Sequence, residues 1–324
     1  MSPHPILDAA VGTPNFAQIF GPVFWGFCIS LILCGVSVMQ GYLYFTRYND
    51  KLWIRLFAGG MITLDFISMA LISQSMYYYM LPHFGSFAPL SAVTPELTVE
   101  CLISAMLTFG SQMYFAYQLF IIRRPGIIAK LANASVVILG TFGLAGGIGC
   151  AVMMFMFPQE VFANRNHTFA ILAGISKGFG AAADIVATIA MCLFLSAADT
   201  GLTRTSGMLK TIMHLFINRG ILVTIAQIGL LITFFATSNH LYWLAFHVNT
   251  TKLYVNTFFA MLNARNSVRS AHGQVSRMTE STNHGGVSAI KYSPREKLED
   301  YELDSPGFEK ATIHVTTTST TAAI

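Results

Sequence analysis

Charged residues are scarce in this sequence. Only 10% of the 324 residues are Asp, Glu, Lys or Arg, whereas 54% are hydrophobic. Soluble globular proteins carry about 25% charged residues, so the composition argues against a soluble domain. Apolar runs of about 18 residues or more have the length of a helix that crosses a bilayer. Continuous runs such as Ile212–Ala236 lack the alternation of β-barrel strands. We therefore expect a helical membrane protein.

Cysteine is also sparse and indicates neither a disulfide framework nor a thiolate metal site. The five cysteines all fall in apolar stretches: Cys28, Cys34, Cys101, Cys150 and Cys192. Zinc sites instead use closely spaced cysteine pairs, and disulfide-rich domains are small and secreted. His240 and His247 are two helical turns apart, about 10.5 Å, which is too far to share one zinc ion. We expect no metal site, no cofactor and no enzymatic activity.

Seven apolar runs are long enough to cross a bilayer. Their expected bounds are 19–42, 56–80, 98–121, 132–157, 168–195, 211–236 and 241–263. Proline is nearly absent from their interiors and no internal repeat is visible, so the pattern does not favour an inverted-repeat transporter with broken helices. The predicted fold is all-α, a seven-helix transmembrane bundle over residues 19–263.

Basic residues are distributed unequally between the two sides of this bundle. Ten fall on one side: Arg47, Lys51, Arg55, Arg123, Arg124, Lys130, Arg204, Lys210, Arg265 and Arg269. Arg165 stands alone on the other side, and the N-terminal segment 1–18 has none. Because basic loops stay in the cytosol, we expect an extracellular N-terminus. The first run is full length and has no basic segment before it, unlike a cleavable signal peptide. The expected location is the plasma membrane or another membrane of the secretory pathway.

Residues 264–324 differ from the rest of the chain. They contain seven Lys or Arg, seven Asp or Glu, and few aliphatic side chains, a composition that predicts a disordered cytosolic tail. Ser293 and Ser305 each precede proline, which is typical of proline-directed phosphorylation sites but also arises by chance in polar tails. Such a tail suits cytosolic partners. The modest net charge of +4 gives no reason to expect nucleic acid.

Six ionisable residues fall inside the expected spans, where an unpaired charge is costly. They are Asp65, Glu100, Lys177, Asp184, Arg219 and Lys252. With a rise of about 1.5 Å per residue, Asp65, Asp184, Arg219 and Lys252 are expected at similar depths, and we predict that they form one polar layer together with Asn256. The layer is either a ligand, ion or switch site, or a charge network that fixes helix packing.

Three smaller patterns are ambiguous. Lys252, midway along the seventh run, suits a Schiff base with a retinal-like aldehyde, but its polar neighbours and the absence of an opsin pattern in the third run disfavour a chromophore. The Gly143–Gly147 step is expected to pack the fourth and fifth spans within one molecule or to form a homo-oligomer face. Asn166-His-Thr168 is a glycosylation sequon close to the membrane surface.

The end of the seventh run resembles a known family motif. It reads Lys252-Leu-Tyr-Val-Asn256-Thr-Phe-Phe-Ala-Met-Leu-Asn263-Ala-Arg265. This is similar to the closing motif of fungal, mainly basidiomycete, membrane proteins that share the domain of unknown function 6534. Ala183-Asp184-Ile-Val-Ala-Thr and Asn218-Arg219-Gly220 also resemble that family, and the domain would cover about 177–265. The resemblance implies a seven-span membrane protein and no known biochemical activity.

Three functions remain open on this basis. A receptor-like sensor fits the seven-span plan with an outer N-terminus and a modifiable tail, although this is an analogy of architecture. The end of the third run, Ile121-Ile-Arg123-Arg124-Pro125, lacks the acidic-arginine pair of the commonest G-protein-coupled receptors. A transporter of small solutes or ions would use the polar layer. A structural membrane protein is the third possibility.

Overall fold

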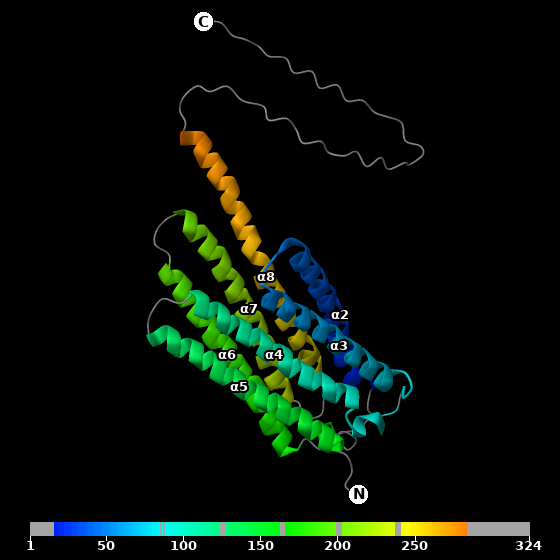
Figure 1. Cartoon of the computed structure of the whole chain (residues 1–324). Helices are drawn as coiled ribbons and strands as arrows, with labels where there is room; N and C mark the ends of the chain where they lie inside the picture. Colours follow the sequence, from blue (N-terminus) through cyan, green and yellow to red (C-terminus); the bar gives the residue numbers. More distant parts are fainter. Residues whose placement is uncertain are drawn as a thin grey trace, which may run out of the picture. The chain divides into compact units, whose positions relative to one another are not determined.

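The computed structural model describes residues 16–84, 86, 88–122, 127–162, 166–198, 203–236 and 241–283. This part of the chain forms seven long helices (Figure 1): α2 Phe16–Arg47, α3 Leu52–Met80, α4 Pro95–Ile122, α5 Ile127–Met156, α6 His167–Ala198, α7 Thr203–Ala236 and α8 Tyr242–Asn283. Two short 3-10 turns, Ala88–Ser91 and Pro158–Glu160, lie between them. Each predicted span lies almost entirely within one helix, which confirms the all-helical prediction. The contacts described below lie in the first of two structural units, Met1–Met278, and not in the second, Thr279–Ile324.

Five of these helices are long and apolar enough to cross a membrane, namely α2, α3, α5, α6 and α7. The helices α4 and α8 are less apolar because polar residues interrupt them, such as Gln112 in α4 and Asn249–Lys252 in α8. Their polar side chains are largely buried, as Gln112 and Lys252 show. The helices are therefore compatible with an integral membrane protein.

The helices expose apolar side chains and bury polar ones. Trp25 is 67% exposed and Phe155 is 73% exposed, whereas Asp65, Glu100 and Lys252 are completely buried. In water this arrangement would leave apolar surface unfavourably hydrated and would desolvate charges. In a bilayer the exposed apolar groups face lipid tails, and polar groups turn to the interior of the bundle. The distribution of side chains supports the membrane interpretation independently of helix length.

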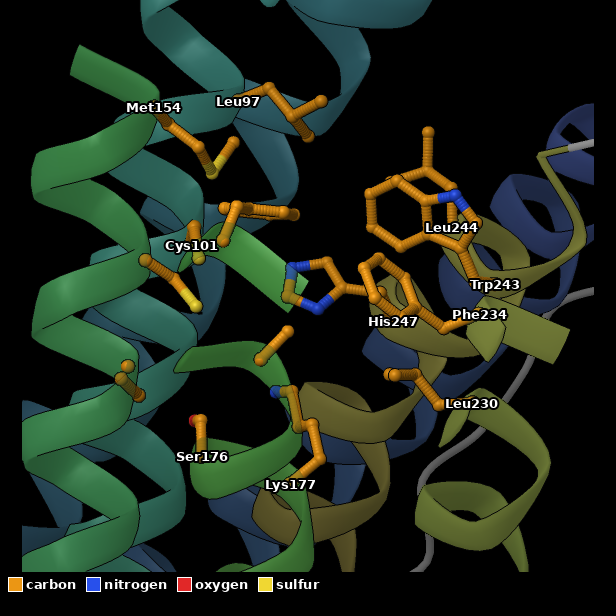
Figure 2. Close-up of a pocket in the computed structure, with 15 residues that line it drawn as sticks. Leu97, Cys101, Met154, Ser176, Lys177, Leu230, Phe234, Trp243, Leu244 and His247 are labelled. Carbon is orange, nitrogen blue, oxygen red and sulfur yellow. The ribbon is translucent and has the colours of Figure 1, made fainter. Parts of the chain in front are cut away.

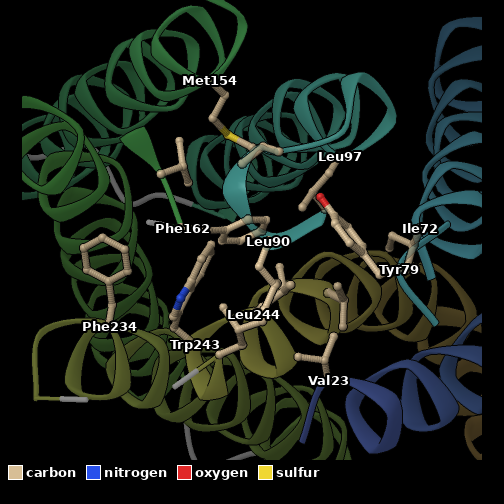
Figure 3. Packing of buried hydrophobic residues seen from close by; sticks show 14 of the residues in the cluster. Val23, Ile72, Tyr79, Leu90, Leu97, Met154, Phe162, Phe234, Trp243 and Leu244 are labelled. Atoms are coloured by element: carbon tan, nitrogen blue, oxygen red, sulfur yellow. The ribbon is translucent and has the colours of Figure 1, made fainter. Parts of the chain in front are cut away.

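Among the described residues, the interior contains two separate hydrophobic clusters. On α3, Met61 belongs to the first cluster and Ile72 to the second, and on α8 Val255 and Val248 are divided in the same way. Figure 3 shows residues of the second cluster. The buried charged residues of α3 and α8 lie between these positions in the sequence, so a polar band separates the two clusters.

A ladder of asparagines joins α8 to α2. The side-chain amides of Asn249, Asn256 and Asn263 donate to the backbone carbonyl oxygens of Gly26, Leu33 and Gln40, at 2.9, 2.8 and 2.9 Å. Donors and acceptors both advance by seven residues, so the two helices run parallel with the repeat of a left-handed supercoil. At the first rung, a Cβ atom on Gly26 would lie 2.7 Å from Cα of Ala245, so only glycine permits this approach.

Glycines of α5 allow close contact inside the molecule. A Cβ atom on Gly146 would lie 2.7 Å from the backbone nitrogen of Ser176 on α6, and one on Gly147 would lie 2.5 Å from Cβ of Ala105 on α4. A Cβ atom on Gly143 would also meet the backbone of Ser176, at 3.3 Å. The glycine step of α5 thus packs helices within one molecule, which was one of the two predicted uses; the other was a homo-oligomer face.

The last helix is longer than the sequence predicted. α8 continues to Asn283, so residues 264–283, expected to begin a disordered tail, are helical. This segment contains no proline, and extending an existing helix costs less than nucleating a new one. The expectation of disorder for 284–324, like most of the predicted N-terminal segment 1–18, concerns residues outside the described ranges.

Candidate functional site

Lys252 on α8 and Asp65 on α3 form a buried ion pair. The Nζ atom of Lys252 lies 2.8 Å from Oδ1 of Asp65, and both side chains are 0% exposed. The same ammonium group donates to the backbone carbonyl oxygen of Asp65 at 2.9 Å. A charged amine that must be buried is favourable only when its donors find acceptors. These two bonds supply acceptors and hold α8 against α3.

Ser68 connects this pair to a second one. Nζ of Lys252 lies 3.4 Å from Oγ of Ser68, and that hydroxyl donates to Oε1 of Glu100 on α4 at 3.2 Å. Oε2 of Glu100 lies 2.9 Å from Nε2 of His247 on α8. Asp65, Lys252, Ser68, Glu100 and His247 thus form one continuous set of buried polar contacts, here named the charge chain. It links α3, α4 and α8.

Asp184 on α6 is the centre of a separate polar group. Its Oδ2 atom accepts hydrogen bonds from the hydroxyl of Tyr254, from Nε2 of Gln112 at 3.4 Å, and from Nε2 of Gln227 at 3.2 Å. Arg219 on α7 is 4.0 Å from Oδ1. These five residues, here named the Asp184 cluster, come from α4, α6, α7 and α8. Several neutral donors therefore stabilise the carboxylate in addition to one rather distant cation.

Arg219 has two further contacts on α4. Its NH2 group donates to Oγ of Ser111 at 2.9 Å, and its guanidinium carbon lies 4.2 Å from the centre of the Phe115 ring. A guanidinium over an aromatic face gains a cation–π attraction, which grows when water is excluded. Arg219 is 4% exposed, so these contacts replace hydration.

The predicted single polar layer is divided in the structure. Among the described residues, no hydrogen bond or ion pair joins the Asp65–Lys252 pair to the Asp184 cluster. The reason is helical geometry: Lys252 and Tyr254 are two positions apart on α8, and at about 100° per residue they point to different sides of the helix. Asn256, expected in the layer, turns instead to α2 as a rung of the asparagine ladder.

A cavity of about 40 Å³ lies between α4, α5, α6, α7 and α8. Its walls are mainly apolar and include the aromatic rings of Phe169, Phe234 and Trp243. Two basic side chains, Lys177 and His247, also line it, and Figure 2 shows Lys177 extending from α6 toward the space beside the His247 ring. His247 therefore belongs both to the cavity wall and to the charge chain.

The sequence interpretation missed several partners in this site. Glu100 and Lys177 were recognised as ionisable residues in spans, but neither was assigned to the polar layer. Their roles depend on His247, which is 147 residues from Glu100, and on the cavity that only the folded bundle creates. The neutral residues Gln112 and Gln227 carry no signal of their own in a single sequence. In contrast, the seven-residue spacing of the asparagines on α8 is visible in the sequence itself.

The predicted modification sites give no further functional group. Asn166 lies just before α6, where its Oδ1 atom accepts from the backbone N–H of Thr168 at 3.0 Å and so caps the helix. Glycosylation there stays a prediction. Ser293 and Ser305 lie outside the described residues. In the described part of the chain, no group of three or more His, Cys, Asp or Glu residues could hold a metal ion.

Fold and site together define a helical membrane protein with a charged interior. Residues 180–267 match the model described as "Family of unknown function (DUF6534)". The matched segment supports the resemblance seen in the sequence, and it contains Asp184, Arg219, Lys252 and Asn256. No curated protein and no solved structure matches the chain.

Proposed function

We propose that the chain is a seven-span membrane protein that acts as a receptor-like sensor. Its N-terminus is outside, its C-terminus is in the cytosol, and it resides in the plasma membrane or another membrane of the secretory pathway. The observation that carries the proposal is the double position of His247. This residue lines the cavity and also contacts Glu100, at 2.9 Å, in the charge chain.

The charge chain supplies a physical route from the cavity to the helices. A ligand beside His247 changes the contact between His247 and Glu100. Glu100 shares Ser68 with Lys252, so the change alters the balance of contacts that holds α8 against α3. A ligand shifts such an equilibrium only by the difference in its affinity for the two arrangements. The proposed signal is this shift, carried by α8 toward the C-terminal tail.

Two observations support the seven spans and their orientation. The asparagine ladder makes α2 and α8 parallel, as the first and last of seven alternating spans must be. The basic residues are concentrated on the side where α2 ends and α3 begins, which favours that side as cytosolic. Glu100 and Gln112 on α4 and Lys252 on α8 are buried and hydrogen-bonded within the bundle, so they do not prevent these helices from spanning.

Proximity labelling in cells tests the sensor proposal. The full chain carries a labelling enzyme at its C-terminus, and the parent is compared with His247→Gln. We expect the set of labelled cytosolic proteins to change, because the variant disturbs the contact with Glu100. The control His167→Gln alters an exposed histidine outside the charge chain and should label as the parent does.

Identical labelling by the parent and His247→Gln, with equal amounts of protein at the membrane, would contradict the sensor proposal. A transporter is the competing function. Solute flux in proteoliposomes that falls in Asp184→Asn would support transport instead.

A further inference from the structure

We propose that the cavity between α4 and α8 binds a short-chain aliphatic monocarboxylate, with Lys177 as the contact for the carboxylate group. This inference rests on the proposed sensing function, because it names the ligand class for the cavity that is proposed as the sensing site. It follows from the charge, the size and the lining of the cavity.

Lys177 has no ion-pair partner among the described residues, although Glu100 attracts it at longer range. Among the described residues, no carboxylate oxygen lies within ion-pair distance of its amine; the three ion pairs present involve Arg219, His247 and Lys252. Both carboxylate oxygens of Glu100 already have partners. The Lys177 side chain is half-buried, and an ammonium group inside a span is costly without an acceptor. A ligand carboxylate would supply both the negative charge and the acceptor, in a short charge-assisted hydrogen bond.

The volume of the cavity limits the ligand to a few heavy atoms. A water molecule needs about 10–15 Å³ of such volume, so the 40 Å³ present suits a molecule of the size of acetate to butanoate. The aromatic walls and Leu230 favour an alkyl group over a second charge. Dicarboxylates and phosphate esters are therefore disfavoured. The carboxylate of Glu100, which contacts His247, does not line the cavity.

Binding would act directly on the charge chain. A carboxylate held by Lys177 places a negative charge beside the His247 ring (Figure 2). That charge repels the carboxylate of Glu100, which contacts the same imidazole. The proposed ligand would thus weaken the contact through which His247 is tied to Ser68 and Lys252.

The test is ligand-observed fluorine NMR on the full chain in phosphatidylcholine nanodiscs. The probe is fluoroacetate, whose size lies between acetate and butanoate, and its neutral counterpart is 2-fluoroethanol. We expect saturable broadening of the carboxylate signal and displacement by butanoate. Lys177→Met should weaken binding by about tenfold or more, the value of one charge-assisted hydrogen bond. Lys177→Arg should restore it, and Lys130→Met, which removes an exposed lysine, should leave it unchanged.

Several outcomes would overturn the proposal, and one of them needs no variant. If the alcohol binds to the parent as well as the carboxylate does, Lys177 does not select the ligand, even where Lys177→Met fails to fold. Displacement of the probe by chloride at the same concentrations as butanoate would indicate an inorganic anion site. An unchanged affinity of a folded Lys177→Met variant for the carboxylate probe would also contradict the proposal.

The two proposals can fail separately. Lys177-dependent binding with no effect of His247→Gln on proximity labelling would uphold the carboxylate site and contradict the sensor. Altered labelling in His247→Gln together with no carboxylate binding would uphold the sensor and contradict this ligand class.

Discussion

Single residues in this bundle show how a membrane protein keeps charges in its interior. Lys252 has three acceptors within 3.4 Å, one carboxylate oxygen, one backbone carbonyl oxygen and one hydroxyl. The N–H donors of the ammonium group therefore have protein acceptors and do not require water.

Removing one partner of this pair should be far more damaging than removing both. We expect Lys252→Met to lower the free energy of unfolding by about 3–5 kcal/mol, because Asp65 is left buried with its charge uncompensated. The double variant Asp65→Leu with Lys252→Met should recover most of that loss. The measurement is denaturant-induced unfolding in detergent, arranged as a double-mutant cycle. Lys130→Met is the control, and additive effects of the two single changes would argue against the pair.

For single residues, the sequence predicts which side chains are unusual in a membrane span but not which of them contact one another. Scarcity of charge made Asp65 and Lys252 conspicuous, and electrostatic balance predicted acids opposite bases. Their pairing depends on the rotation of α3 and α8 about their own axes, which is set by contacts between residues 187 positions apart. The Asp184 cluster relies on neutral amides, for which composition gives no warning.

At the scale of elements, the asparagine ladder is the clearest case of a regular pattern with a structural role. Asn256 donates to Leu33 on α2 and also to the carbonyl oxygen of Lys252 on its own helix, at 2.9 Å. Interhelical bonds of this kind matter in a membrane because lipid offers no alternative partner. The repeat keeps α2 and α8 in register over three rungs.

Replacing a rung should loosen this helix pair. We expect Asn256→Ala to lower the free energy of unfolding by about 1 kcal/mol relative to Asn218→Ala, in line with interhelical hydrogen bonds in membrane proteins. Asn218 is exposed on α7, and its replacement brings the same gain in helix propensity. Unfolding in detergent measures both variants. Equal stabilities would mean that the rung contributes nothing.

Helices were the most predictable elements, because runs of apolar residues define them without reference to contacts. Their ends were less predictable. α7 begins at Thr203, before the expected start at 211, and α8 passes the expected end at 263. Apolarity marks the part of a helix that suits lipid, whereas backbone hydrogen bonding continues into polar sequence. The hydropathy of a segment therefore predicts a span better than it predicts a helix.

For the whole molecule, the orientation remains a prediction that tags can test. An N-terminal epitope is expected to bind antibody on intact cells, and a C-terminal epitope only after permeabilisation. The reason is the excess of basic residues on one side together with the parallel direction of α2 and α8. Two tags on the same side would contradict an odd number of spans.

These two tags alone do not distinguish seven spans from five, since both numbers are odd and five helices are clearly apolar enough. An epitope inserted between residues 199 and 202 separates the models. If α4 crosses, the segment between α6 and α7 is cytosolic and the epitope is hidden in intact cells. If neither α4 nor α8 crosses, the segments between these two helices change side and the epitope becomes accessible, while the C-terminus stays cytosolic. We expect it to be hidden, because Glu100 and Gln112 are buried and hydrogen-bonded against other helices, so α4 presents paired polar groups inward rather than to lipid.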